Sequence, residues 1–207
     1  MNIDKFRNAT GITTALATRW YPHLTATFDE FGIKSATEQA MFIAQVGHES
    51  AGFSRIAESF NYSQQGLRAT FGHRLSDEQI SMLGRQSGET VVPQNRQAAI
   101  ANLVYSGRLG NKAPSDGWKF RGRGLIQITG LDNYRACGNG VALDLVTSPE
   151  LLELDANAMR SAAWFWKSKR LGQYGADVER VTLLVNGGRN GLDDRRERFE
   201  LAHKVLV

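Results

Sequence analysis

Apolar residues recur at helical spacing across residues 37–50, the segment TEQAMFIAQVGHES. Positions three or four residues apart share one face of a helix, so a single stripe runs through this segment. The stripe consists of Phe42, Gln45, Val46 and Glu49. Ser35 or Thr37 can cap the start of the helix, and Gly52 marks its end. The pattern therefore predicts a buried helix whose inner face finishes with a carboxylate.

Four further segments have helical patterns. Residues 76–85 begin with Ser76 as a candidate N-cap and have two acidic residues in the first turn, and residues 96–106 form a second short helix. Residues 148–170 carry Pro149 near their start, where helices favour proline, and residues 177–188 complete the set. We therefore predict a mainly α fold, with residues 1–207 as a single domain and residues 64–106 as a small helical lobe inserted in it.

Residues 125–129, LIQIT, are the one segment with strand-like alternation. Alternation places Leu125, Gln127 and Thr129 on one face and the two isoleucines on the other. Two glycines, Gly122 and Gly124, precede the segment and let another molecule approach the backbone. We interpret it either as a groove wall that hydrogen-bonds a sugar or as an ordinary amphipathic edge strand.

The composition narrows the class of protein. The 207 residues are 42% hydrophobic and 22% charged, which is typical of a folded globular chain. The apolar runs are far shorter than the roughly 18 residues of a membrane span, and the first residues lack the apolar core of a signal peptide. We therefore expect no signal peptide, no transmembrane segment and a cytoplasmic location before any release. The lone Cys137 indicates a packed, inert thiol, and the four scattered histidines argue against a metal site.

The charge favours an acidic partner. Lys and Arg number 25 against 21 Asp and Glu, a net charge of +4, which suits polyanions such as nucleic acid or an acidic cell-wall polymer. The basic residues are dispersed and no RNA- or DNA-binding motif accompanies them. The charge therefore indicates a wall polymer rather than nucleic acid.

Glu49 is the first candidate for chemistry. Apolar neighbours and the negative end of the helix dipole both disfavour an ionised carboxylate, so we expect a raised pKa and a proton available to a leaving oxygen. The alternative is a side chain that reaches solvent or pairs with an arginine. Because a neutral amide is easier to bury, Glu49→Gln is expected to leave stability unchanged or raised.

Glu58 is the second candidate, nine positions along the chain. In a continuous helix it would lie about 13 Å further along the axis and on the opposite face. A break at Gly52 would let the chain turn back, so that the two carboxylates face each other across a groove. A separation of roughly 6.5 to 9.5 Å would leave room for a water molecule between them, as in inverting glycosidases. A solvated turn residue is the alternative for Glu58.

Four blocks of sequence together resemble glycoside hydrolase family 19, the chitinase-like enzymes of the lysozyme superfamily. The blocks are GHES (47–50), AESFNYS (57–63), FRGRGLIQITGLDNY (120–134), and VNGG (185–188) followed by DDRRERF (193–199). Along its whole length the chain more closely resembles the short single-module endolysins of bacteriophages. The resemblance implies a mainly α fold with a minimal strand element, in which two helical lobes flank a substrate groove.

The resemblance also implies roles for single residues. Glu49 corresponds to the general acid and Glu58 to the base that activates water. Gln127 and Thr129 correspond to the amide and hydroxyl that hold this water and the sugar, with Thr129 standing where plant chitinases have a serine. Asn133 corresponds to a substrate-binding asparagine.

Two more correspondences lie near the C-terminus. Asn186 matches another substrate-binding asparagine, and Arg195 an arginine that orients the acid and base. Arg196 and Arg198 are close neighbours, and the choice of Arg195 rests on the flanking Asp194 and Phe199. Taken singly, each residue matched to the family in this way also has a purely structural interpretation, such as a helix cap for Asn186 or a local ion pair for Arg195.

Aromatic residues near these blocks offer stacking surfaces for sugar rings. Tyr62 and Trp118 are in loop-like sequence and are interpreted as substrate-binding, whereas Phe120 is expected to pack under the groove.

These observations lead to one functional hypothesis and several alternatives. We expect a monomeric phage-type endolysin that hydrolyses β-1,4 glycosidic bonds of bacterial peptidoglycan without a cofactor. It would need a separate holin-type protein to reach the wall. The alternatives are a chitinase, a lytic transglycosylase, and a non-catalytic wall-binding protein on a degenerate hydrolase fold.

Overall fold

The computed structural model describes residues 1–207 and is mainly helical. The elements are α1 (Ile3–Thr10), α2 (Thr14–Phe31), α3 (Ala36–Glu49), α4 (Gln64–Phe71), α5 (Asp77–Leu83), α6 (Gln94–Val104), α7 (Asp116–Lys119), α8 (Leu131–Val141), η1 (Pro149–Glu153), α9 (Asp155–Ser168), η2 (Leu171–Tyr174), α10 (Val178–Asn186) and α11 (Leu192–Leu206), where η marks a 3-10 helix. The predicted mainly α fold is therefore confirmed.

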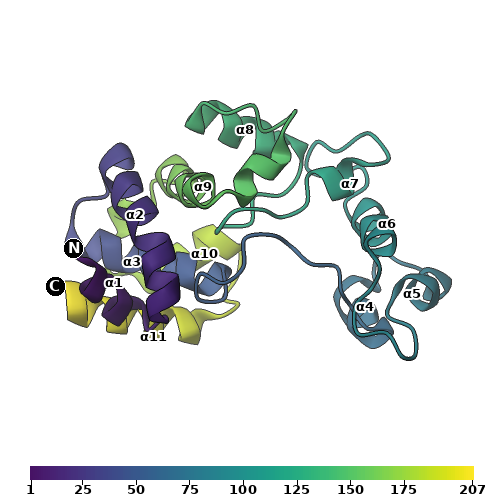
Figure 1. Ribbon diagram of the computed structural model, residues 1–207, viewed down its shortest axis with the longest axis horizontal. Helices are drawn as coiled ribbons and strands as arrows, with labels where there is room; N and C mark the ends of the chain where they lie inside the picture. Colours follow the sequence, from purple (N-terminus) through teal and green to yellow (C-terminus); the bar gives the residue numbers. More distant parts are fainter.

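The larger core surrounds α3. Every residue from Ala40 to Gly47 is buried, so this helix is enclosed on all sides rather than on one stripe. Helices α1, α2, α9, α10 and α11 contribute most of the other members of a cluster of 25 buried residues. Figure 1 shows α3 among these helices, with both chain termini at the same end of the molecule. Glu49 thus stands at the end of the best-buried helix in the chain.

A second, smaller core belongs to α4, α5 and α6, which we call the small lobe. Its seven buried residues include Phe60 from the segment that leads into α4 and Val104 at the end of α6. Figure 1 shows the three helices grouped at the end of the molecule opposite the termini. The small lobe therefore has its own apolar interior.

Several helix boundaries follow the predicted signals. Ser35 caps α3 and Ser76 caps α5 with a complete capping box, and α3 ends before Gly52. Residues 148–170 form two elements rather than one helix, because Leu154 is extended and separates η1 from α9. Helices α1, α2, α8 and α11 lie outside the segments that the pattern predicts.

The predicted strand at 125–129 is wrong. Residues 124–127 form a tight turn closed by an isolated bridge between Arg123 and Ile128. Gly124 and Gln127 have φ of 76° and 56°, which no extended strand can accommodate. The alternating pattern arises because Ile128 is buried in a small core with Phe120 and Tyr134, whereas Gln127 lies on the wall of a cavity.

None of the helices combines the length and the apolar character that crossing a bilayer requires. Cys137 is buried, and burial raises the pKa of its thiol to about 12, in agreement with a packed and unreactive side chain.

Candidate active site

Glu49 and Glu58 line the same cavity. Its volume is about 500 Å³, and Gln127 and Tyr62 also form its walls, together with Arg55, Ala57, Ser59 and Asn61. Glu49 comes from the end of α3, Glu58 and Tyr62 from the segment before α4, and Gln127 from the 124–127 turn. The fold thus brings both predicted carboxylates to one surface.

The Glu49 carboxylate is held from α11. Arg195 Nη2 donates a hydrogen bond to Glu49 Oε1. The same guanidinium donates through Nη1 to Gln45 Oε1 at 2.5 Å, and Gln45 lies one helical turn before Glu49. Arg195 is only 1% exposed, so its charge is buried and faces this acid. Of the two interpretations of Glu49, the structure has the pairing with an arginine rather than purely apolar surroundings.

Of the three neighbouring arginines, Arg195 alone reaches Glu49. Arg196 pairs with Glu179 and Asp193, and Arg198 pairs with Asp194. Asp194 also contacts His48 Nδ1 at 2.6 Å, which joins the first turn of α11 to the residue before Glu49. The residues on either side of Arg195 are therefore both held: Asp194 by His48 and Arg198, and Arg196 by Glu179.

Glu58 is positioned by backbone pairing. Its N–H donates to the carbonyl of Gly122 at 2.8 Å, and the N–H of Gly124 donates to the carbonyl of Ile56 at 2.8 Å. These two bonds flank an antiparallel bridge between Ala57 and Arg123. The GRG block at 122–124 thus sets the register of the segment that carries Glu58.

Two donors hold the Glu58 carboxylate. Tyr105 Oη lies 2.9 Å from Oε1 and 3.1 Å from Oε2, and the N–H of Gly122 donates to Oε2 at 3.0 Å. Burial raises the pKa of the Glu58 carboxyl above its ordinary value, while the hydrogen bonds from Gly122 and Tyr105 and the charge of Arg121 act in the opposite direction. A raised pKa suits a group that must take a proton from water.

Tyr105 is absent from the residues that the sequence predicts for the site. It follows the last turn of α6, in the small lobe, and is 47 positions from Glu58. Neither the helical pattern of residues 96–106 nor the blocks that carry the family resemblance distinguishes it from a packed tyrosine. Only the tertiary structure brings its hydroxyl to the carboxylate.

A neighbouring cavity of about 430 Å³ extends the site. Gln127 lines both cavities, and the second also contains Thr129 and Asn133. Its other polar or aromatic lining residues are Trp164, Phe165 and Ser168 of α9 and Lys169, which caps this helix. Asn133 Nδ2 donates to the carbonyl of Thr129 at 2.8 Å, so the turn and the start of α8 support each other. Three of the predicted polar residues thus lie along one continuous surface.

Besides Arg195, which holds Glu49 from behind, two predicted residues lie outside both cavities. Asn186 is the exposed last residue of α10. Trp118 is part of the short helix α7 rather than a loop, and it packs on the core of the small lobe with Arg121 4.0 Å from its ring centre. The expectation of a loop at Trp118 is therefore wrong, because helix α7 forms there and one face of the indole is covered. Tyr62 does lie in a loop and lines the first cavity.

Comparison with known proteins decides the family. A model of the family of glycosyl hydrolases described as class I chitinase matches residues 88–177. A protein of Haemophilus influenzae described as a glycosyl hydrolase family 19 domain-containing protein is 40% identical over 177 residues, which is 84% of this chain and 83% of its own length. This chain belongs to glycosyl hydrolase family 19. The predicted family and the predicted enzyme class, a glycoside hydrolase, are both confirmed.

Solved family 19 structures share the fold. A bacterial family 19 chitinase superposes with a TM-score of 0.63 at 17% identity, covering 99% of this chain and 94% of its own. Chitinase C of Streptomyces griseus gives 0.60 at 19% identity, with 99% and 76% covered. Chitinase 8 of rice is 49% identical over 57 residues, only 27% of this chain and 21% of the rice protein.

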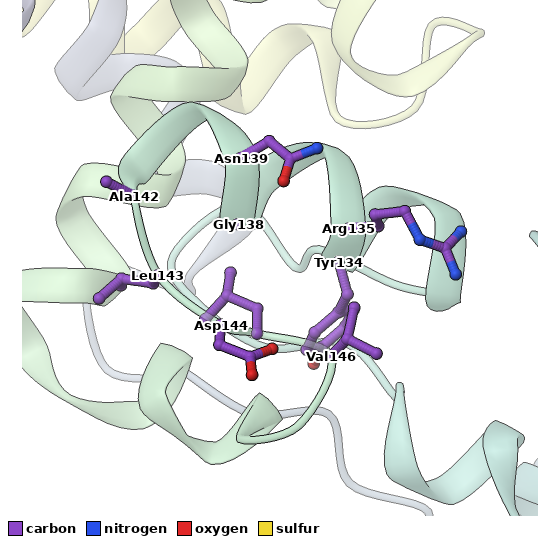
Figure 2. Close-up of a pocket in the computed structure, with 9 residues that line it drawn as sticks. Tyr134, Arg135, Gly138, Asn139, Ala142, Leu143, Asp144 and Val146 are labelled. Carbon is purple, nitrogen blue, oxygen red and sulfur yellow. The ribbon is translucent and has the colours of Figure 1, made fainter.

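A third cavity in this family 19 chain, about 480 Å³, lies on α8 and the loop that follows it (Figure 2). Its polar side chains are Arg135, Asn139 and Asp144. Arg135 pairs with Asp132, and Asp144 accepts a hydrogen bond from the N–H of Thr147. No predicted site residue lines this cavity, and two of its three polar side chains already have local partners. The pair of glutamates therefore defines the candidate site.

The chain contains no group of three or more His, Cys, Asp or Glu residues arranged to hold a metal ion.

Proposed function

We propose that this family 19 glycoside hydrolase is a phage-type endolysin that hydrolyses β-1,4 glycosidic bonds of bacterial peptidoglycan by an inverting acid and base mechanism. The observation that carries the chemistry is that Glu49 and Glu58 line one cavity and that Gln127 lines both this cavity and the neighbouring one. An inverting glycosidase needs two such carboxylates, one on each side of the scissile bond.

Glu49 acts as the general acid. Arg195 binds its Oε1, which leaves Oε2 as the oxygen that carries the proton toward the cavity. As the glycosidic bond breaks, this proton passes to the leaving oxygen, and the carboxylate that forms is stabilised by the adjacent guanidinium. Arg195 thus keeps the acid in place through the step.

Glu58 acts as the general base. A water molecule on the opposite face of the sugar attacks the anomeric carbon and gives its proton to Glu58, so the product has inverted configuration. Gln127 and Thr129 orient that water and the sugar. The Gln127 amide donates to the carbonyl of Gly124 at 3.0 Å, which fixes its orientation and leaves its oxygen free as an acceptor.

Peptidoglycan is preferred to chitin because of charge. Apart from the two glutamates, the charged residues of the two cavities are Arg55 and Lys169, both exposed and without an ion-pair partner. The whole chain has a net charge of +4. Peptidoglycan carries carboxylates on its peptide stems, whereas chitin is neutral, so a basic groove favours the former.

The cellular setting is part of the same proposal. The enzyme acts as a monomer, is held in the host cytoplasm, and reaches the wall when a separate holin-type protein permeabilises the membrane. Its partner is then the peptidoglycan itself, and it needs no cofactor.

A chitinase is the second candidate. Most relatives that match parts of the chain are described as chitinases or endochitinases, and the solved structures with this fold are chitinases as well. The non-catalytic alternative is not retained, because the chain belongs to a hydrolase family and keeps both carboxylates at the cavity.

The products distinguish these candidates. Purified peptidoglycan treated with the enzyme should release new reducing ends without new free amino groups, because a glycosidase breaks acetal bonds and leaves amides intact. Product NMR should show the inverted anomer. An anhydro sugar in place of a reducing end would indicate a lytic transglycosylase, and faster cleavage of colloidal chitin would favour the chitinase.

A further inference from the structure

We infer that Tyr105 is a positioning residue for Glu58 and that, through it, the small lobe is a working part of the active site rather than only a support for substrate. This inference rests on the proposed role of Glu58 as the base. It comes from a hydrogen bond between residues of different parts of the fold.

The contact involves both carboxylate oxygens. Tyr105 Oη lies within 3.1 Å of each, and the hydroxyl has one proton to share between them. The N–H of Gly122 approaches Oε2 at 3.0 Å. Two donors from two segments therefore restrict the Glu58 side chain to one orientation.

The Tyr105 hydroxyl keeps its proton, and so acts as a hydrogen-bond donor, at every pH at which the enzyme works. Burial and the nearby charge of Glu58 raise the pKa of Tyr105 above its ordinary value, so its proton stays on the oxygen. Hydrogen bonds to an ionised acceptor are stronger than those to a neutral one. Tyr105 thus favours the carboxylate form of Glu58 and opposes the effect of burial.

Other charged and titratable groups face the same carboxyl. They are Arg121, Tyr62, and the cavity residues Glu49 and Arg55. Among side chains, Tyr105 is the one that hydrogen-bonds to Glu58. Its effect can therefore be separated from theirs by removing a single oxygen atom.

The small lobe sets the place of this hydroxyl. Tyr105 is the C-terminal cap residue of α6, and its ring lies perpendicular to Phe60, with 6.1 Å between ring centres. Phe60 belongs to the buried core of the lobe, and the carbonyl of Tyr105 accepts a hydrogen bond from Asn111 at 3.1 Å. The 122–124 block thus holds the backbone of Glu58, and the lobe adds, through Tyr105, the one side-chain donor to its carboxylate.

The test is Tyr105→Phe, which removes the donor and keeps the ring. The pKa of Glu58 should rise by about one unit, the size expected for a lost hydrogen bond to a charged group. Two measurements report it: the acidic limb of kcat/KM against pH, and the titration of the ¹³C-labelled Glu58 carboxyl by NMR. At the lower pH values activity should fall about tenfold, with smaller losses at neutral pH.

Two controls exclude a merely structural role. Tyr21→Phe removes a hydroxyl that bonds the carbonyl of Met1 at 2.8 Å, and it should move neither measurement. Ile80→Val loosens the core of the small lobe while keeping the Tyr105 hydroxyl, so it should lower the melting temperature without moving the Glu58 titration.

An unchanged carboxyl titration in a folded Tyr105→Phe protein would overturn the inference. A shifted titration in Tyr105→Phe, together with a wild-type enzyme that cleaves no peptidoglycan, would support the inference and refute the proposed function. The NMR measurement needs no substrate, so the two failures are distinguishable.

Discussion

At the scale of single residues, the pairing of Glu49 with Arg195 changes what a substitution should do. From the sequence, Glu49→Gln is expected to leave stability unchanged or raised. In the structure, Arg195 is buried and Glu49 is the only carboxylate that pairs with it. Removing one partner leaves a buried charge without compensation.

Glu49→Gln should therefore keep the fold but lower the free energy of unfolding by roughly 1 to 2 kcal/mol, a value below the usual range for buried pairs because Glu49 is partly exposed and the amide still accepts a hydrogen bond. Lysis should fall by at least about 10²-fold, as expected for a lost general acid. Urea unfolding and a turbidity assay on permeabilised cells measure the two effects. Near-normal lysis by the folded variant would remove Glu49 from the mechanism.

Glu58 gives a pH-dependent prediction. Burial raises the pKa of its carboxyl in the folded state, so folding favours the protonated form. The contribution of Glu58 to stability is therefore fully present below the pKa that its carboxyl has in the unfolded chain. This contribution is lost as the pH rises through the pKa that the carboxyl has in the folded protein. Glu58→Gln remains neutral, and its oxygen can accept from Tyr105 and Gly122.

The Glu58→Gln variant should thus melt at a higher temperature than the wild type at pH 7, and the two curves should converge below about pH 4. Activity should fall, although slow attack by a water held by Gln127 and Thr129 would leave some hydrolysis. Equal melting temperatures at pH 7 would contradict the assigned effect of burial.

At the scale of elements, the site depends most on the GRG block at 122–124 and the 124–127 turn. A Cβ at Gly122 would lie 2.7 Å from Gln127 Oε1 and 3.3 Å from Glu58 Cβ. Its N–H and carbonyl also bind Glu58. The segment that carries Glu58 and the turn that carries Gln127 approach this position so closely that glycine fits best here.

Gly122→Ala should displace Gln127 and Glu58 and reduce kcat by about tenfold or more, since small misplacements of catalytic groups are costly. Gly188→Ala is the matched control, because its added Cβ meets no atom within 4 Å. Circular dichroism and kcat on soluble glycan fragments would check both variants. A fully active Gly122→Ala enzyme would show that the turn does not set the geometry.

At the scale of the whole molecule, charge governs the choice of substrate. The net charge of +4 and the unpaired Arg55 and Lys169 in the groove attract carboxylates, and salt screens this attraction. Lys169 also lies 5.9 Å from the ring centre of Phe165, on the wall of the second cavity. We therefore expect the peptide stems to be recognised by the charge of Lys169 in the groove as well as by the net charge of the whole chain.

Lys169→Gln should lower kcat/KM on peptidoglycan by roughly two- to fivefold at low salt, the range for an exposed ion pair. The difference should shrink as salt is raised, and cleavage of neutral chitin oligomers should not change. Lys5→Gln removes the same charge at an exposed position of α1 that lines neither cavity, and it serves as the control. Equal effects of the two substitutions would show that Lys169 acts only through the net charge of the chain and not through its place in the groove.

The sequence alone determined the helical class, the end of α3 before Gly52, the capping of α5 by Ser76, and the two carboxylates, because periodicity, caps and short motifs are local signals. Local signals failed at residues 125–129, where the alternating pattern predicts a strand. The positive φ angles of Gly124 and Gln127 instead make this segment a tight turn. Local signals also missed Tyr105, the buried state of Arg195, and the covered face of Trp118. Each depends on residues far apart in the chain, such as Glu58 with Tyr105 or Glu49 with Arg195. Only packing decides which of several arginines or tyrosines reaches a given carboxylate, because desolvation and hydrogen bonding act between segments that the fold brings together.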